Sequence, residues 1–430
     1  MSRILFVYPN KEGYPIIPVG ISILSGILKN RGHQTDIFDV TFMIPERLDH
    51  KAREDAGVVQ KVDVQRFWGS GDKVDMEDEF RKKLASFRPD LIAVSIVENN
   101  YLCAKRLCEL AKEATPAPIV VGGVFPTTVQ DIFIQDRNID LICMGEGEYP
   151  IAELADRLAQ GKDLAGTCNV IVKRGGGVMQ GPFAKYYDWD PPVFQDWEIF
   201  DKRHLIKPFM GKMYRTGFFE LSRGFPHQCT YCVNHNYQKL FKGLGKYNRV
   251  RPLSQAMDEI LHMKEHYGLE LLFFIDENFL TMTKARLAAF CSEYRSRVGL
   301  PFYIMTRADS LLDEDKPRML RECGCVTIGI GVESGNEDIR NKLMDKKIPN
   351  SVYEKAFANC HRHDIRTTAN IMMGLPFETE ENILESARFC RKLQAGASRW
   401  PSSRLIRAPN CARSASRTAS WKTNSTKTST

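Results

Sequence analysis

A pair of cysteines in a loop is the feature of this sequence with the clearest chemical potential. In the segment SRGFPHQCTYC, residues 222–232, Cys229 and Cys232 stand in a C-x-x-C spacing among glycine, proline and histidine. Thiolates at this spacing can hold iron or zinc. Four residues before Cys229, where a third thiolate would complete a cluster-binding loop, the chain has Phe225. The segment is therefore a metal site, a metal site with one ligand missing, or two ordinary cysteines.

Two alternatives to an iron site stay open. A zinc site needs two further ligands, and Cys323 and Cys325 are available, but C-x-C at a strand edge is poor spacing for such a site. Alternatively, both thiols are small buried apolar groups, as free cysteines commonly are. The spare ligand His227 lies only two residues from Phe225 and two from Cys229, and this spacing disfavours it as the third ligand.

Charged side chains end several predicted strands in the second half of the chain. Asp276 and Glu277 end one strand, Arg307 ends the next, and Glu333 ends a third. Carboxylates suit hydrogen bonds to an ammonium group or to ribose hydroxyls, and arginine suits a carboxylate. N-capping, solvated strand ends or a surface ion pair would explain the same residues without a ligand.

The elements that position these residues alternate between strand and helix. Apolar runs separated by helical patterns occupy residues 217–224, 269–276, 301–307, 326–334 and 367–374. Five βα units with polar groups at the strand ends predict a TIM-like barrel, complete or partial, with its active site at that face.

The first 165 residues show a second alternation. Their predicted strands are residues 3–9, 35–40, 90–97, 118–123 and 139–148. This order predicts an α/β, doubly wound parallel sheet of the Rossmann or flavodoxin-like kind, whose ligands bind beyond the carboxyl ends of the strands. Residues 41–88 interrupt the rhythm and read as a polar insertion that carries Trp68.

The strand ends of this sheet are rich in glycine. Glycines allow a backbone to approach a flat or phosphorylated ligand closely, although tight turns alone would also explain them. The candidate residues are Ser95, Gly122, Gly123, Gly145, Glu146 and Gly147.

These patterns divide the chain into four parts. We predict a first domain at 1–165, a linker with a glycine hairpin at 166–212, a partial barrel at 213–396, and a tail at 397–430.

The order of motifs resembles the radical S-adenosylmethionine (SAM) enzymes that carry an N-terminal cobalamin-binding domain. The resemblance covers about residues 1–396. PIIPVGISILSGILKNRGH and GEGE look like the cobalamin domain, and SRGFPHQCTYC looks like the cluster loop C-x3-C-x2-C with phenylalanine first. The barrel motifs are FFIDENF (273–279), GIGVESG (329–335) and NIMMGLPFETEEN (370–382).

The resemblance implies three cofactors: a 4Fe–4S cluster, SAM and cobalamin. Three thiolates would hold three irons, SAM would chelate the fourth, and an electron would split the sulfonium to give a 5′-deoxyadenosyl radical. The residues implied at the SAM site are Asp276, Glu277, Arg307, Glu333, Ser334 and Gly374, and the strand-end set from Ser95 to Gly147 would hold cobalamin. Because the chain lacks a D-x-H-x-x-G motif, no histidine would bind the lower face of cobalt.

The commonest activity implied is methyl transfer to an unactivated carbon of a small-molecule or natural-product-like substrate. A flavodoxin or ferredoxin would donate the electron. A ring-closing or rearranging radical enzyme is the nearest alternative, and a non-catalytic cobalamin-binding protein is the alternative from another class. With two thiolates we expect a labile or absent cluster, so the chain as written would be inactive.

After Gly396 the amino-acid composition changes and the strand–helix pattern ends. Residues 397–430 contain seven basic residues, no acid and many serines and threonines, as a disordered tail does. A shifted reading frame is another interpretation. In that frame, each codon consists of the third base of one residue's codon and the first two bases of the next residue's codon. Read in this way, Ser403 to Cys411 can encode TPYPGTEL, a string similar to one found in this family after the sixth barrel strand. We favour a frameshift near residue 396 and a non-native tail.

The net charge of +7 comes from this tail, because the remaining basic and acidic residues are equal in number. A neutral body gives no sign of a nucleic-acid surface. No apolar run approaches the roughly 20 residues of a membrane helix, and the N-terminus reads as a strand rather than a signal peptide. We expect a cytoplasmic protein with reduced cysteines, no transmembrane segment and no nucleic-acid partner.

Overall fold

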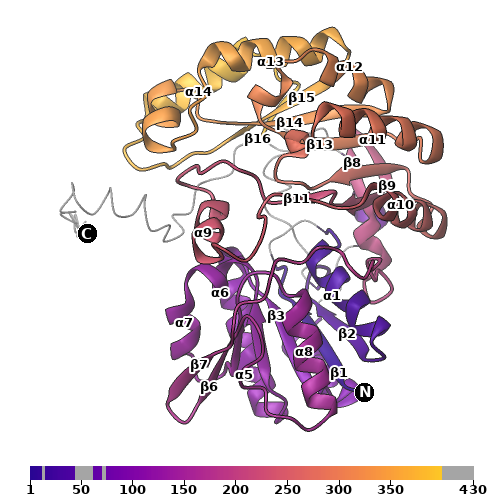
Figure 1. Cartoon of the computed structure of the whole chain (residues 1–430), viewed down its shortest axis with the longest axis vertical. Helices are drawn as coiled ribbons and strands as arrows, with labels where there is room; N and C mark the ends of the chain where they lie inside the picture. The colour runs from indigo at the N-terminus through magenta and orange to yellow at the C-terminus, as the bar shows by residue number, and fades with distance from the viewer. Residues whose placement is uncertain (12–14, 44–61, 70–73, 400–430) are drawn as a thin grey trace, which may run out of the picture.

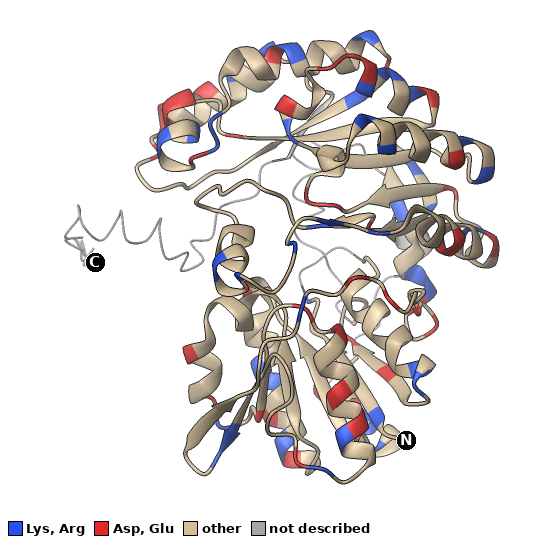
Figure 2. Cartoon of the chain, viewed as in Figure 1, with Lys and Arg blue, Asp and Glu red and all other residues tan. Residues whose placement is uncertain are grey.

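The structure, a computed structural model, describes residues 1–11, 15–43, 62–69 and 74–399. Figure 1 shows two sheets, each with its own helices, stacked along the long axis of the molecule. Within the described residues, no helix is both long and apolar enough to span a membrane. Lysines and arginines alternate with acids along the outer helices in the view of Figure 2.

The N-terminal sheet has the strand order β2-β1-β3-β4-β5-β6-β7, and its first five strands are parallel. This is the flavodoxin-like order of a doubly wound sheet, so the predicted fold class is confirmed for this half. The parallel strands are β1 (Arg3–Tyr8), β2 (Gln34–Asp39), β3 (Leu91–Ser95), β4 (Ile119–Gly122) and β5 (Leu141–Cys143).

Alternating side chains of β1 explain why helices cover both faces. Ile4 and Phe6 join one buried cluster, and Leu5 and Val7 join another, as expected of a strand buried on both sides. The helices of this half are α1 (Val19–Asn30), α3 (Gln65–Trp68), α4 (Met76–Phe87), η1 (Glu98–Asn100), α5 (Tyr101–Ala114), α6 (Val124–Thr128), α7 (Gln130–Gln135) and α8 (Glu148–Ala159).

The predicted glycine hairpin is present, and it packs onto the first sheet. Strands β6 (Val170–Arg174) and β7 (Gly177–Gln180) form it, and β6 pairs antiparallel with β5. The hairpin therefore extends the first sheet and is not part of a linker over 166–212. The predicted insertion is only partly described, and its Trp68 is buried, with the indole N–H donating to the Ile206 carbonyl at 3.0 Å.

The second sheet is an open, curled half-barrel with the order β16-β15-β14-β13-β12-β9-β8, which confirms the partial barrel. All neighbouring strands are parallel except β8 at one edge. The strands are β8 (Ile206–Phe209), β9 (Lys212–Phe219), β12 (Leu271–Phe274), β13 (Phe302–Thr306), β14 (Cys325–Glu333), β15 (Arg366–Ile371) and β16 (Ala397–Arg399).

Helices cover the outer face of this sheet, and short turns follow the strands. These elements are η2 (Lys202–Leu205), α10 (Leu253–Tyr267), η3 (Phe279–Thr281), α11 (Lys284–Arg297), η4 (Ala308–Leu311), α12 (Asp315–Glu322), the π-helix η5 (Ile339–Leu343), α13 (Asn350–Arg362) and α14 (Glu380–Lys392). The remaining helix, α9 (Val233–Leu240), lies between the two halves, next to α6 (Figure 1).

Two predicted boundaries in this half were wrong. The first barrel strand ends at Phe219, and Ser222–Arg223 forms a separate strand, β10, paired with β11 (Arg249–Val250). Residues 397–399, predicted as tail, form β16 beside β15, because the Gly396 N–H donates to the Thr367 carbonyl at 2.9 Å and sets the register. The rest of the predicted tail lies outside the described residues.

Candidate functional site

The cysteine loop connects β10 to α9. Cys229 is buried, Cys232 caps α9, and the buried ring of Phe225 lies 5.7 Å from the ring of His227. Burial raises the pKa of Cys232 to about 11, so this thiol is protonated at neutral pH. The Gln238 amide donates to the Phe225 carbonyl at 2.9 Å and so fixes the backbone of the loop at this residue.

The donor set does not fit a cluster held by three protein ligands. Among the described residues, no three His, Cys, Asp or Glu side chains gather closely enough to hold a metal ion. The zinc alternative also lacks support, because Cys323 contacts Cys291 at 2.9 Å and Cys325 contacts the Thr327 carbonyl. Cys229 and Cys232 as iron ligands therefore stay a prediction.

Arg307 connects the loop to the barrel. This buried guanidinium lies 3.8 Å from the sulfur of Cys229, pairs with Asp309 at 3.0 Å and donates to the Lys346 carbonyl at 3.3 Å. Cys229 thus faces a positive charge.

Lys346 joins the same group from the other side. Its buried ammonium lies 2.7 Å from a Glu333 carboxylate oxygen and 3.4 Å from the hydroxyl of Tyr231, which stands between the two cysteines. Burial alone would lower the pKa of Lys346, but Glu333 outweighs it and the pKa is raised. Glu333 has a φ of +65°, an uncommon backbone conformation for a residue with a side chain. The ion pair with Lys346 thus holds the Glu333 carboxylate beside the cysteine loop.

The two acids after β12 have different surroundings. Asp276 is buried and accepts hydrogen bonds from the Leu221 N–H at 3.2 Å and from the Ser222 hydroxyl, so it anchors β10. Burial raises the pKa of Asp276 to about 7. Glu277 accepts from the Gly224 N–H at 3.2 Å and lines a cavity; solvent reaches this residue, but the surrounding protein desolvates its carboxylate and raises its pKa.

The other predicted SAM residues lie at neighbouring strand ends. Ser334 is buried, and its carbonyl accepts from Arg340 at 2.6 Å. Gly374 has a φ of +77°, and its N–H donates to Glu378 at 2.6 Å.

A cavity of about 480 Å³ lies between the two sheets, within the size range of small-molecule sites. Residues of both halves line it. The first half contributes every residue of its predicted strand-end set: Ser95, Gly122, Gly123, Gly145, Glu146 and Gly147. The second half contributes Glu277 and the rings of Tyr237, Phe241 and Tyr247, and none of the lining residues is a histidine.

Two of these glycines have backbones that disfavour other residues. Gly123 has a φ of +104°, and an added Cβ would lie 2.7 Å from the Ile96 carbonyl oxygen. Gly145 has a φ of +74°, and its Cβ would lie 2.5 Å from the ring of Phe241. The strand ends therefore expose backbone to the cavity, and α9 packs directly against them.

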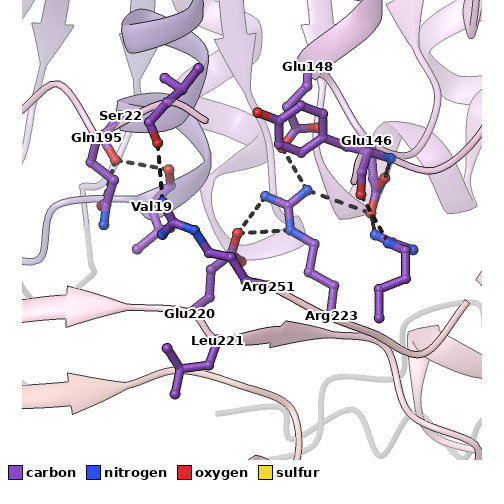
Figure 3. Close-up of polar contacts among 12 residues, drawn as sticks. Val19, Ser22, Glu146, Glu148, Gln195, Glu220, Leu221, Arg223 and Arg251 are labelled. Atoms are coloured by element: carbon purple, nitrogen blue, oxygen red, sulfur yellow. Dashed lines mark hydrogen bonds and ion pairs between the residues drawn. The ribbon is translucent and has the colours of Figure 1, made fainter. Parts of the chain in front are cut away.

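An ion-pair network borders the cavity where the two halves meet (Figure 3). Arg223, two residues before Phe225, lies 2.6 Å from Glu148 of the first half and 2.6 Å from Glu220 of its own half. Arg249, its partner across β10 and β11, pairs with Glu146. Burial raises the pKa of Glu148 although Arg223 opposes the change.

The arrangement agrees with comparisons to known families. Residues 10–155 match the model of the B12 binding domain, and residues 219–390 match that of the radical SAM superfamily. The chain is therefore a radical SAM protein with an N-terminal B12 binding domain.

Individual relatives are distant. The anaerobic magnesium-protoporphyrin IX monomethyl ester cyclase of Rubrivivax gelatinosus is 24% identical over 93% of this chain and 67% of its own length. The cobalamin-dependent radical SAM methyltransferase TokK of Streptomyces tokunonensis is 26% identical over 68% of this chain and 43% of its own. The solved radical SAM methyltransferase TsrM of Kitasatospora setae, with cobalamin and a 4Fe–4S cluster bound, superposes with a TM-score of 0.70 at 19% identity, covering 94% and 75% of the two chains.

Sequence reasoning missed several residues of this site. Tyr231 could have been noticed, because it stands between the two cysteines. Lys346, Arg223 and Arg249 carry no local signal, since their partners lie on other elements far along the chain.

Proposed function

We propose that this chain is a cobalamin-dependent radical SAM protein of the methyltransferase type, with cobalamin bound in the cavity between the two halves. The observation that carries the proposal is that the complete strand-end set of the first half and Glu277 of the second half line one cavity. The strand-end glycine backbone and the rings of Tyr237 and Tyr247 would hold a corrin there by packing.

SAM would bind at the barrel strand ends next to this cavity. Glu277 would receive its ammonium group, Arg307 its carboxylate, and Glu333 and Ser334 its ribose hydroxyls, with Gly374 beside the adenine. Asp276 would act indirectly, since its hydrogen bonds to Leu221 and Ser222 hold the start of the loop.

Phe225 limits the chemistry of this chain. A phenyl ring offers no lone pair to iron, and the described residues supply no third ligand. We propose that the chain as written binds corrin and does not sustain reductive cleavage of SAM, which would need Cys at position 225.

Two other functions have specific support. The cyclase relative aligns over 93% of the chain, which favours radical ring closure as the second candidate. The incomplete donor set favours a non-catalytic cobalamin-binding protein. The substrate class, a flavodoxin or ferredoxin donor and a cytoplasmic location remain proposals.

Corrin binding can be tested with a steric variant and a matched control. Gly20 lines the cavity on α1, and an added Cβ meets no atom within 4 Å. Gly20→Phe should therefore fold and abolish retention of hydroxocobalamin in equilibrium dialysis. Gly177→Phe, in the hairpin β6–β7, adds the same ring away from the cavity and should bind like the parent. Absence of binding by the parent chain would remove cobalamin from the proposal.

A further inference from the structure

The short ribbon of β10 and β11 presents two arginines to one acidic turn of the first half. Arg223 and Arg249 are direct partners in the antiparallel pair. Their guanidinium groups reach Glu148 and Glu146, which flank Gly147 at the start of α8. The side chains of Arg223 and Glu148 are 14% and 5% exposed, so solvent screens this pair only weakly.

Both ends of this connection belong to sites described above. The acidic turn continues directly from Gly145 and forms part of the cavity wall. Arg223 precedes the loop of Cys229 and Cys232, and Arg249 also donates to the Tyr187 carbonyl at 3.0 Å. Glu146 accepts the Tyr187 N–H at 2.7 Å, so backbone and side chains together fix the turn against the ribbon.

We propose that Arg223 is a positioning residue that couples the cavity to the cysteine loop through Glu148 and Glu146. A ligand that orders the acidic turn holds Arg223, and Arg223 then restricts the loop that follows it. Coupling between two sites typically changes a binding affinity about fivefold or more, and we take the low end of this range as the expected size of the effect. The cavity ligand rests on the proposed function, but the connection itself does not.

Two acids that contact the same guanidinium provide a matched pair of variants. Glu148→Gln and Glu220→Gln each remove one carboxylate charge 2.6 Å from Arg223 without changing side-chain shape. Both carboxylates line the cavity, but only Glu148 belongs to the first half of the chain, whereas Glu220 lies three residues from Arg223 in the same half. A purely local role of Arg223 predicts similar effects of both changes, and coupling predicts an effect of Glu148→Gln alone.

The readout is the alkylation rate of the half-buried Cys232, measured by peptide mass spectrometry after reaction of the full chain with N-ethylmaleimide. Without ligand, Glu148→Gln should accelerate alkylation about fivefold, and Glu220→Gln should stay within about twofold of the parent. Hydroxocobalamin should slow alkylation in the parent and in Glu220→Gln but not in Glu148→Gln. Unfolding midpoints show whether each variant is folded.

Equal rates for the two variants without ligand would overturn the coupling, as would an unchanged hydroxocobalamin effect in Glu148→Gln. If the parent retains no hydroxocobalamin in dialysis, the proposed function fails, and the ligand-free comparison still decides the coupling. Arg223→Lys keeps the positive charge, but a lysine cannot contact Glu148 and Glu220 at the same time as the guanidinium does. Its alkylation rate at Cys232 should therefore match that of Glu148→Gln.

Discussion

Ionisation of the buried Asp276 should lower the free energy of unfolding as pH rises. Its pKa is about 7 in the folded chain because the carboxyl group is buried, against about 3.9 for an unfolded chain. A raised pKa means that the folded state binds the proton more tightly. The contribution to stability is therefore fully present below about pH 4 and is lost as pH rises through about 7.

The size of this effect follows from the shift. Three pKa units at about 1.4 kcal/mol each give about 4 kcal/mol over the whole window, and about 2.5 kcal/mol of it falls between about pH 5 and 7.5. Asp276→Asn resembles the neutral acid in shape and keeps an acceptor for the Leu221 N–H, but it does not titrate. The variant should therefore lose about 2.5 kcal/mol less than the parent over the same pH range.

The assay is urea unfolding followed by tryptophan fluorescence, at about pH 5 and 7.5, for the parent and Asp276→Asn. The quantity compared is the difference in unfolding free energy between the two pH values, so other titrating groups cancel. Parallel pH dependences in the two proteins would refute the burial argument. So would a parent that gains stability relative to the variant at the higher pH.

Three further changes have defined outcomes. The first is Phe225→Cys, combined with a frame-corrected C-terminus. After anaerobic reconstitution, its iron and sulfide contents should rise toward four each per chain, and it should produce 5′-deoxyadenosine from SAM in the presence of dithionite. A full cluster in the Phe225 chain would disprove the interpretation that the loop lacks one ligand. Phe377→Gly should raise the free energy of unfolding by about 1 kcal/mol, because Phe377 is exposed and has a φ of +64°, a backbone conformation that glycine adopts more easily. A free energy of unfolding below that of the parent would show that the Phe377 ring makes a stabilising contact. Resequencing of the gene should reveal a frame change near codon 396, and a confirmed frame would end that hypothesis.

The fold class could be predicted because its signals are local. The buried run at β1 and the alternation of strands with helices already indicate two parallel sheets. The pairing of β6 with β5 could not be predicted, since an antiparallel hairpin can join any exposed sheet edge and its partner is not encoded nearby. The short β16 likewise forms by pairing with the distant strand β15, over residues 368–370, and its own three residues carry no strand signal.

The residues of the candidate site also fall into two groups: those with a local sequence signal could be predicted, and those that depend on distant partners could not. Strand-end residues such as Gly123 and Glu277 were predictable, because the carboxyl ends of parallel strands meet at one edge. The connection between the halves was not, since Arg223 and Glu148 are distant in sequence and meet only when both sheets are formed. Asp276 is a third case: its position at a strand end was predicted, but its burial and its hydrogen bonds to Leu221 and Ser222, which make it an anchor of the loop, were not.

The contacts of the cysteine loop explain why a missing ligand need not disturb the fold. Asp276 holds its start, Gln238 holds the Phe225 carbonyl, and the Thr230 hydroxyl donates to the Leu343 carbonyl at 2.8 Å. All three contacts are independent of metal, and the buried Phe225 ring adds apolar surface where a thiolate would stand. These contacts support the loop with Phe225 in place, so the fold of the loop does not require a cysteine at position 225, and the proposed corrin binding at the neighbouring cavity is independent of the proposed loss of the cluster.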